Sequence, residues 1–156
     1  MQKNNSYTIK EATERIQSYC SVQERCQWDI KIKMKKWNLS EEMSENILKN
    51  LILEDFVNEE RFAASFCRGK FKTKKWGKIK IINELNIRKI SENFIEKGLL
   101  QIDNEEYLKL LKNLYIKKNS SLKDTNQFIR KGKIAKYLQQ KGFEIELIWE
   151  VINKDK

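Results

Sequence analysis

Basic residues gather around one tryptophan in the middle of the chain, and these side chains are the strongest candidates for a functional site. From Arg61 to Asn83 the sequence contains no acidic residue. Cations without local acidic partners repel one another, so such a run in a folded protein favours an anionic partner, either nucleic acid or an acidic protein surface. We therefore predict a polyanion-binding site made of Arg61, Arg68, Lys70, Lys72, Lys74, Lys75, Trp76, Lys78 and Lys80.

Alternative interpretations exist for the run and for two of its members. The whole run is also compatible with a solvated helix face, which is the usual meaning of clustered charge. Trp76 is either a stacking platform for nucleobases or, the preferred interpretation, an indole that closes the joint between helices while Gly77 permits a close turn. Arg61 follows Glu59 and Glu60, so local ion pairing and contact with an acidic partner carry equal weight.

Residue types that carry catalysis are sparse. The sequence has no histidine to act as a base near neutral pH, and no GxxxxGK[ST] phosphate-binding loop. The adjacent acids Glu59–Glu60 and Glu105–Glu106 point about 100° apart on a helix, so the members of a pair do not share a proton or a metal ion. Arg68 would stabilise a Cys67 thiolate, but the apolar stripe that holds this cysteine favours a buried, inert thiol. We expect no enzyme activity, cofactor or metal; a metal-dependent nuclease is the weakest alternative.

Composition predicts an almost entirely α-helical protein. The 156 residues include no proline and five glycines, so little interrupts a helix. The net charge of +10, from 32 basic and 22 acidic residues, favours a polyanionic partner over an acidic small molecule.

The cysteine content and the hydropathy pattern indicate a compartment. Three cysteines without a CxxC motif argue against a disulfide framework and against a zinc site, and are typical of a reducing environment. No apolar run approaches the roughly 20 residues that cross a bilayer, and the N-terminus lacks the apolar core of a signal peptide. We expect a cytoplasmic protein that does not bind membranes.

Helical periodicity divides the chain into three similar cycles. Apolar residues recur at helical spacing behind the capping residues Thr8, Ser40, Asn58, Ser91 and Asp103. Paired cysteines and paired tryptophans of the first two cycles are separated by 47 and 48 residues, which is typical of helical repeat proteins. We predict three tandem three-helix repeats at 1–55, 56–102 and 103–156, after a lead-in over residues 1–7.

The repeats are expected to stack. Each is too small to bury its own apolar face, which predicts an elongated, curved, solenoid-like body. The middle helix of each repeat is basic, whereas residues 40–60 carry seven acids and one lysine, so stacking would align the basic helices along one side. Trp28, Trp37 and Trp149 lie on apolar stripes and are predicted to be core residues. The expected helix bounds include a second helix from Val22, a basic helix over 75–85, a loop over 118–126 and an eighth helix from Phe128.

The order of motifs in the second repeat carries a family resemblance. An acidic turn is followed by Arg-Phe-Ala, an aromatic residue, the basic run, Trp-Gly and a helix rich in lysine and isoleucine. This order resembles the RecX family of bacterial recombination regulators. The resemblance is strong to about residue 103 and weaker beyond, where Gly132 and Lys133 lack an adjacent tryptophan. The matching residues are Arg61, Phe62, Ala63, Phe66, Arg68, Lys70, Lys75, Trp76, Gly77, Lys80, Ile81, Glu84 and Leu85.

The resemblance implies tandem three-helix repeats and an activity that is not catalytic. Proteins of this family bind the groove of the RecA recombinase filament, bridge neighbouring subunits, and mostly restrain strand exchange and co-protease activity; weak, nonspecific binding to single- and double-stranded DNA is a family trait. We expect a monomeric regulator of recombination, DNA repair and the SOS response, and inhibition is the expected direction although stimulation stays open. The alternative is a nonspecific DNA-binding module that acts without a recombinase.

Overall fold

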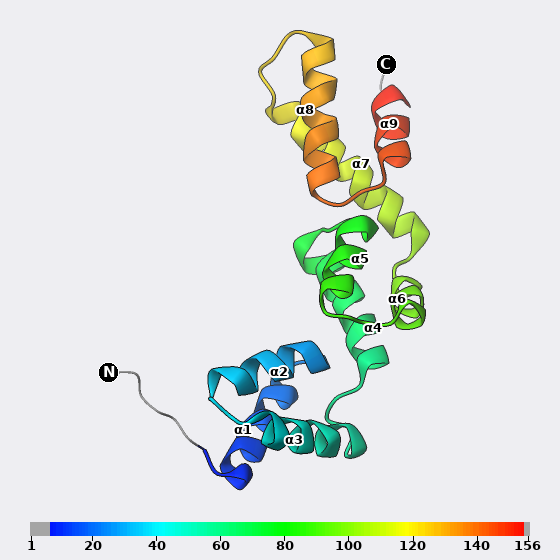
Figure 1. Ribbon diagram of the computed structural model, residues 1–156. Helices are drawn as coiled ribbons and strands as arrows, with labels where there is room; N and C mark the ends of the chain where they lie inside the picture. Colours follow the sequence, from blue (N-terminus) through cyan, green and yellow to red (C-terminus); the bar gives the residue numbers. More distant parts are fainter. Residues whose placement is uncertain (1–6, 155–156) are drawn as a thin grey trace, which may run out of the picture.

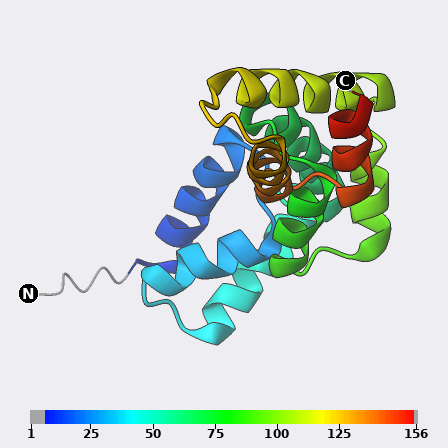
Figure 2. The same cartoon turned by 90° about the horizontal axis from the view of Figure 1, so that it is seen from above.

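The computed structural model describes residues 7–154, and these form nine α-helices and one π-helical segment, with no strand. Figure 1 shows the helices in successive groups along an elongated, curved body, and Figure 2 shows the first group displaced to one side of the others. The tandem three-helix architecture is therefore confirmed. The elements are α1 Ile9–Val22, α2 Gln27–Lys36, α3 Glu41–Leu53, α4 Glu59–Gly69, the π-helix η1 Lys70–Lys74, α5 Lys78–Ile87, α6 Glu92–Leu99, α7 Asn104–Ser121, α8 Gln127–Gln140 and α9 Ile145–Lys154.

Side-chain caps begin the helices at the predicted residues. The Thr8 hydroxyl accepts a hydrogen bond from the Glu11 N–H at 3.2 Å and donates to the Glu11 carboxylate at 3.1 Å. Each of the other caps accepts from the backbone N–H three residues further on, which satisfies a donor that has no partner inside the helix. These caps are Ser40 (3.2 Å), Asn58 (2.8 Å), Ser91 (3.4 Å) and Asp103 (3.0 Å).

The second helix begins later than predicted. Val22 ends α1 and is 79% exposed, so it is not part of α2. Cys26 is the N-cap of α2, and the Asp29 carboxylate accepts hydrogen bonds from the Cys26 N–H at 3.4 Å and from its thiol at 3.1 Å. Asp29 lies in the first turn of α2, and its carboxylate caps the helix by accepting from the Cys26 N–H, so the helix begins at Gln27.

Other predicted bounds and core positions also need correction. α7 continues to Ser121, which shortens the predicted 118–126 loop. Trp149 is 37% exposed, so it is not the core residue that was predicted, and α8 begins at Gln127, one residue before the 87% exposed Phe128. Trp149 lies roughly 60–100° round α9 from the buried Ile148 and Ile152, whereas Phe128 lies in the first turn of α8, ahead of the residues of that helix that reach the core. Trp28 and Trp37 are half-buried and pack against core clusters.

The predicted lead-in lies outside the described residues except for Tyr7. The Tyr7 ring meets Trp37 edge-on, with 5.4 Å between ring centroids, and the Arg15 guanidinium lies 4.4 Å from the Tyr7 centroid. Tyr7 therefore belongs to the packed first repeat.

The apolar core has two parts. Ala12, Ile16, Ile30, Met34 and residues of α3 form one cluster that the first repeat closes with its own helices and Val57. The prediction that every repeat must bury its apolar face on a neighbour is thus wrong for the first repeat. It holds for the other two, because helices α4–α9 share a second, larger cluster.

The second and third repeats meet through two glycines. A Cβ on Gly77 would lie 2.3 Å from the carbonyl carbon and oxygen of Gly142. The Gly77 φ angle of −75° suits any residue, so the glycine is required by this close approach and not by the turn that the sequence suggested. Gly142 has φ +98° and directly follows Lys141, the C-cap of α8, which is the position where glycine commonly ends a helix.

Hydrogen bonds complete this joint. The N–H groups of Gly77 and Ile79 donate to the carbonyls of Lys141 and Gly142 at 2.8 and 2.9 Å. The Lys78 N–H donates to the Tyr107 hydroxyl at 2.9 Å. α5 has no side-chain cap, so the third repeat supplies the acceptors for its first N–H groups.

We predict that Gly77→Ala destabilises the protein by at least about 1–3 kcal/mol, because the added methyl group forces the two repeats apart. Urea unfolding followed by circular dichroism measures the change. Gly69→Ala is the matched control, since no atom lies within 4 Å of its Cβ position, and helix propensity makes it neutral or slightly stabilising. Equal stability of the two variants would contradict the assigned role of Gly77.

Candidate functional site

The basic run follows an unusual backbone path between α4 and α5. After Gly69 the helix widens into η1, and the path ends at Lys75, which has left-handed backbone angles of φ 58° and ψ 41°. The N–H groups of Lys75 and Trp76 both donate to the Lys70 carbonyl, the second at 3.1 Å. π-Helical turns are rare and occur frequently at functional sites. The predicted helix over 75–85 therefore begins three residues late, at Lys78, because the π-turn and the left-handed residue precede it.

Packing holds this path in place. Phe71 of η1 is buried, and its ring centroid lies 6.1 Å from that of Tyr107 in α7. A left-handed non-glycine residue costs roughly 1–2 kcal/mol, and such a conformation persists where its surroundings determine it. With Phe71 inward, Lys72, Lys74 and Lys75 are exposed.

Trp76 is half-buried and packs against the core shared by the second and third repeats. Its ring lies edge-on to Phe66 at 6.4 Å. The ammonium groups of Lys70 and Lys80 lie 5.1 and 4.7 Å from its centroid, within the range of cation–π attraction. This packing agrees with an indole that closes a joint; a base-stacking role stays a prediction.

The structure separates the predicted cations into two groups. Lys70 and Lys80 flank Trp76, and the exposed lysines of η1 and position 75 precede it. Arg68 and Lys78 instead reach the connection between α6 and α7, where they donate to Gln101 at 3.1 Å and Asn104 at 3.3 Å.

Arg61 lies apart from both groups. Its guanidinium pairs with Glu24 at 2.5 Å and with Asp55 at 3.0 Å, and the hydrogen bond to Glu24 raises the Arg61 pKa. Arg61 forms ion pairs within the chain, as one of the two interpretations expected, but with Glu24 and Asp55 and not with the adjacent Glu59 and Glu60. Arg61 thus connects α4 to the first repeat, and its contact with an external partner stays a prediction.

Lys141 of the third repeat joins the basic group and was missed from the sequence. Its ammonium donates to the Lys74 carbonyl at 3.1 Å. Burial, followed by the charges of Lys80 and Lys75, lowers the Lys141 pKa. In the sequence, Lys141 is distinguished only by its position before Gly142. That position indicates a place in the basic group only when the contact between Gly142 and Gly77 is known. We name Lys70, Lys72, Lys74, Lys75, Lys80 and Lys141 the basic surface.

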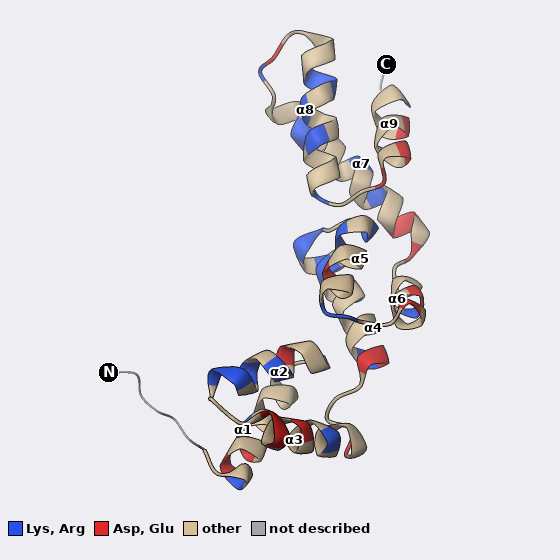
Figure 3. Cartoon of the chain, in the orientation of Figure 1, with Lys and Arg blue, Asp and Glu red and all other residues tan. Residues whose placement is uncertain are grey.

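Charge is distributed unequally around the body. In Figure 3, basic residues of α2, of the η1–α5 region and of α8 lie on the left, whereas acidic residues of α6 and α9 lie on the right. The predicted alignment of basic middle helices along one side is therefore visible in the structure. Six ion pairs form among the described residues, and none includes a member of the basic surface.

A cleft of about 430 Å³ lies between the first two repeats, beside the basic surface. Lys70 and Lys74 contribute to its lining. Its two acids, Glu24 and Asp29, are paired with arginines at 2.5 and 3.8 Å. The lysines at its edge are thus left without acidic partners among the residues described.

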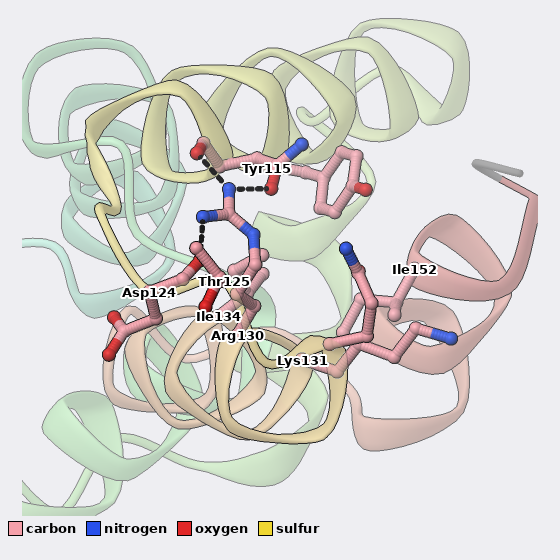
Figure 4. A pocket seen from close by; sticks show the side chains of 9 residues that line it. Tyr115, Asp124, Thr125, Arg130, Lys131, Ile134 and Ile152 are labelled. Carbon is pink, nitrogen blue, oxygen red and sulfur yellow. Dashed lines mark hydrogen bonds between the residues drawn. The ribbon is translucent and has the colours of Figure 1, made fainter.

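A second cavity, of about 470 Å³, lies within the third repeat (Figure 4). Its guanidinium, from Arg130, donates to the carbonyls of Leu122, Asp124 and Asn119 at 2.6–3.0 Å and to the Asn119 side chain at 2.6 Å. Because Arg130 is occupied with the connection between α7 and α8, this cavity is a structural feature of the loop.

Cys67 is completely buried, as predicted, and burial raises its pKa to about 11, which disfavours the thiolate. Within residues 7–154, no three histidine, cysteine or acidic side chains gather in a way that could hold a metal ion. None of the helices in that range is both long and apolar enough to cross a membrane.

The fold and the basic surface define a class of protein, namely tandem three-helix domains with a cationic face on the second domain. Family models for the second and third three-helix domains of RecX match residues 58–99 and 105–152. The chain belongs to the RecX family.

Named relatives agree with this assignment. The regulatory protein RecX of Limosilactobacillus reuteri is 31% identical over 92% of this chain and 54% of the relative, and that of Clostridium acetobutylicum is 26% identical over 92% and 68%. The chain thus spans about half the length of several curated relatives. A crystal structure of regulatory protein RecX superposes with a TM-score of 0.83 at 29% identity, covering 94% of this chain and 73% of that one. RecX from Lactobacillus salivarius shares the fold, with a TM-score of 0.78 at 23% identity over 94% and 95%.

We predict that the stability contributed by the Cys67 thiol is lost as the pH rises from 9 towards 11. The folded pKa of about 11 lies above the ordinary value of 9.0, so the neutral thiol stabilises the fold below pH 9 and this contribution disappears through the folded pKa. The difference in free energy of unfolding between wild type and Cys67→Ala should fall by on the order of 2 kcal/mol. A constant difference across this range would show that the thiol is accessible to water.

Proposed function

We propose that this protein is a non-enzymatic cytoplasmic regulator of homologous recombination that binds the RecA–DNA filament through its basic surface. The observation that carries the proposal is the absence of ion pairs at this surface, while acids elsewhere in the described chain pair with Arg61, Arg88, Lys97 and Lys133. Membership in a family whose curated relatives are named regulatory proteins gives this surface a regulatory context.

The elongated shape suits occupancy of a filament groove. In this proposal the repeats at 1–55, 56–102 and 103–156 lie along the groove. The basic surface then faces the phosphates and acidic side chains of the groove. A protein that binds across adjacent subunits shifts their assembly equilibrium by its differential affinity for the assembled state. It also excludes a second DNA or a repressor substrate, so inhibition is the expected direction.

Wild-type protein added to RecA filaments on single-stranded DNA should lower ATP hydrolysis and strand exchange at stoichiometric ratios. Both rates are measured with and without the protein. A rise in either rate would still indicate filament binding, but with stimulation in place of inhibition. Unchanged rates would refute the proposal.

A second candidate is a nonspecific DNA-binding module, favoured by the alignment of basic helices on one side of the body (Figure 3). Lysines act as point charges with little base information, so such binding would have poor sequence specificity. Cosedimentation at about 0.3 M salt separates the candidates, since screening over roughly 6 Å weakens phosphate attraction more than packed protein contacts. Retention on filaments at this salt concentration, without retention on bare DNA, favours the regulator.

Reversal of two exposed charges should weaken filament binding about tenfold or more. Lys74→Glu with Lys75→Glu replaces attraction to phosphates by repulsion. The matched control is Lys10→Glu with Lys49→Glu, which changes the net charge equally at exposed positions of α1 and α3. Circular dichroism checks that helicity is retained, and equal binding of the two double variants would contradict a specific role for the basic surface.

A further inference from the structure

The joint between the second and third repeats brings together lysines that are distant in sequence. A Cβ on Gly142 would lie 2.3 Å from the Lys80 Cβ and 2.7 Å from the Lys80 nitrogen. This contact places Lys80 of α5 beside the chain segment that contains Lys141. The Lys141 ammonium also donates to the carbonyl of Lys74, the residue before Lys75.

The Lys141 ammonium retains donors for a ligand. It has three N–H donors, and the described contacts use one, to the Lys74 carbonyl. The ammonium groups of Lys70 and Lys80 lie 5.1 and 4.7 Å from the Trp76 centroid, so cations from both η1 and α5 contact this ring. Burial, followed by the charges of Lys80 and Lys75, lowers the pKa of Lys141. The folded chain thus holds Lys75 and Lys80 close enough to the Lys141 ammonium for their charges to repel it.

No ion pair among the described residues relieves this repulsion. Glu144 is the acidic residue nearest to Lys141 in sequence, and its carboxylate accepts a hydrogen bond from the buried Tyr107 hydroxyl. The first N–H groups of α5 do not offer an anion site either, because they donate to the third repeat. Any anion at this joint would therefore be held by the lysine side chains.

We propose that Lys75, Lys80 and Lys141 together hold one phosphate group across the joint between the second and third repeats. Three ammonium groups from different segments supply donors and positive charge to an anion with several oxygens and more than one negative charge. The source of the phosphate is either a nucleic-acid backbone or a free polyphosphate. With nucleic acid as the source, the inference rests on the proposed function and specifies which three lysines of the basic surface hold one phosphate.

The position of the site has a consequence for stability. A ligand that binds only the folded protein raises its unfolding temperature by mass action. A phosphate at this joint also removes the repulsion among the lysines. Phosphate should therefore stabilise the fold more than chloride at the same ionic strength.

The test compares Lys141→Gln with Lys136→Gln, which removes one exposed charge from α8 at a residue outside the joint. Tripolyphosphate is the first probe, and the thermal midpoint is measured against sodium chloride of equal ionic strength. We expect Lys141→Gln to lose at least half of the phosphate-dependent rise, and Lys136→Gln to keep it. Lys141→Arg, which retains the charge, should restore the rise and guards against misfolding of the glutamine variant.

A 20-residue oligothymidylate is the second probe, with affinity measured as a function of salt. Loss of one phosphate contact should reduce the slope of log affinity against log salt by about 0.7 for Lys141→Gln. A response to the oligonucleotide alone assigns the site to a nucleic-acid backbone, and a response to tripolyphosphate alone assigns it to free polyphosphate. Identical behaviour of the glutamine variants with both probes overturns the inference. Filament binding by the wild type is measured separately, so failure of the proposed function leaves the tripolyphosphate result interpretable.

Discussion

The end of α8 meets the start of α5, and the arrangement of the second and third repeats depends on this contact. A helix end leaves carbonyls without partners, and a helix start leaves N–H groups without partners. Here the carbonyls of Lys141 and Gly142 accept from the N–H groups of Gly77 and Ile79. The negative end of one helix dipole thereby faces the positive end of the other. Because this polar contact borders a shared apolar core, the two repeats form one packed unit.

The first repeat is attached in a different way. Its buried residues form a separate cluster, and its connections to the remainder include the Glu24–Arg61 and Asp29–Arg88 ion pairs at 2.5 and 3.8 Å. Partly exposed ion pairs contribute about 1 kcal/mol or less. Cys26 adds an apolar contact because it belongs to the larger cluster. The body therefore combines a pair of repeats that share one core with a first repeat joined to them by ion pairs and by the packing of Cys26 and Trp28.

Local chemistry made much of the fold predictable. Caps such as Thr8 and Asn58 act within one helical turn, so their neighbours in sequence are also their partners in space. The sequence did not reveal the π-turn at Lys70–Lys74, because the burial of Phe71 against Tyr107 arises only after the third repeat has packed. Residue type and helical periodicity likewise overestimated the burial of Trp149, since the neighbouring elements decide how far a stripe is covered.

The candidate site was predictable in composition but not in geometry. The absence of acids from 61 to 83 identified the basic run, whereas its division between Trp76 and the α6–α7 connection depends on contacts with Gln101 and Asn104. Lys141 could not be found from local sequence, because two glycine contacts more than 60 residues apart bring it to the site.

The path from Gly69 to Gly77 constrains the length of the chain as well as its composition. Connections between helices ordinarily tolerate insertions and deletions. Here Phe71 is anchored in the core at one end of the segment, and Gly77 is anchored against the third repeat at the other. A one-residue deletion would let the wide turn revert to regular helix, but it would also move Gly77 away from Gly142. This connection therefore acts as a fixed spacer, and the distance between its anchors permits little variation in residue number.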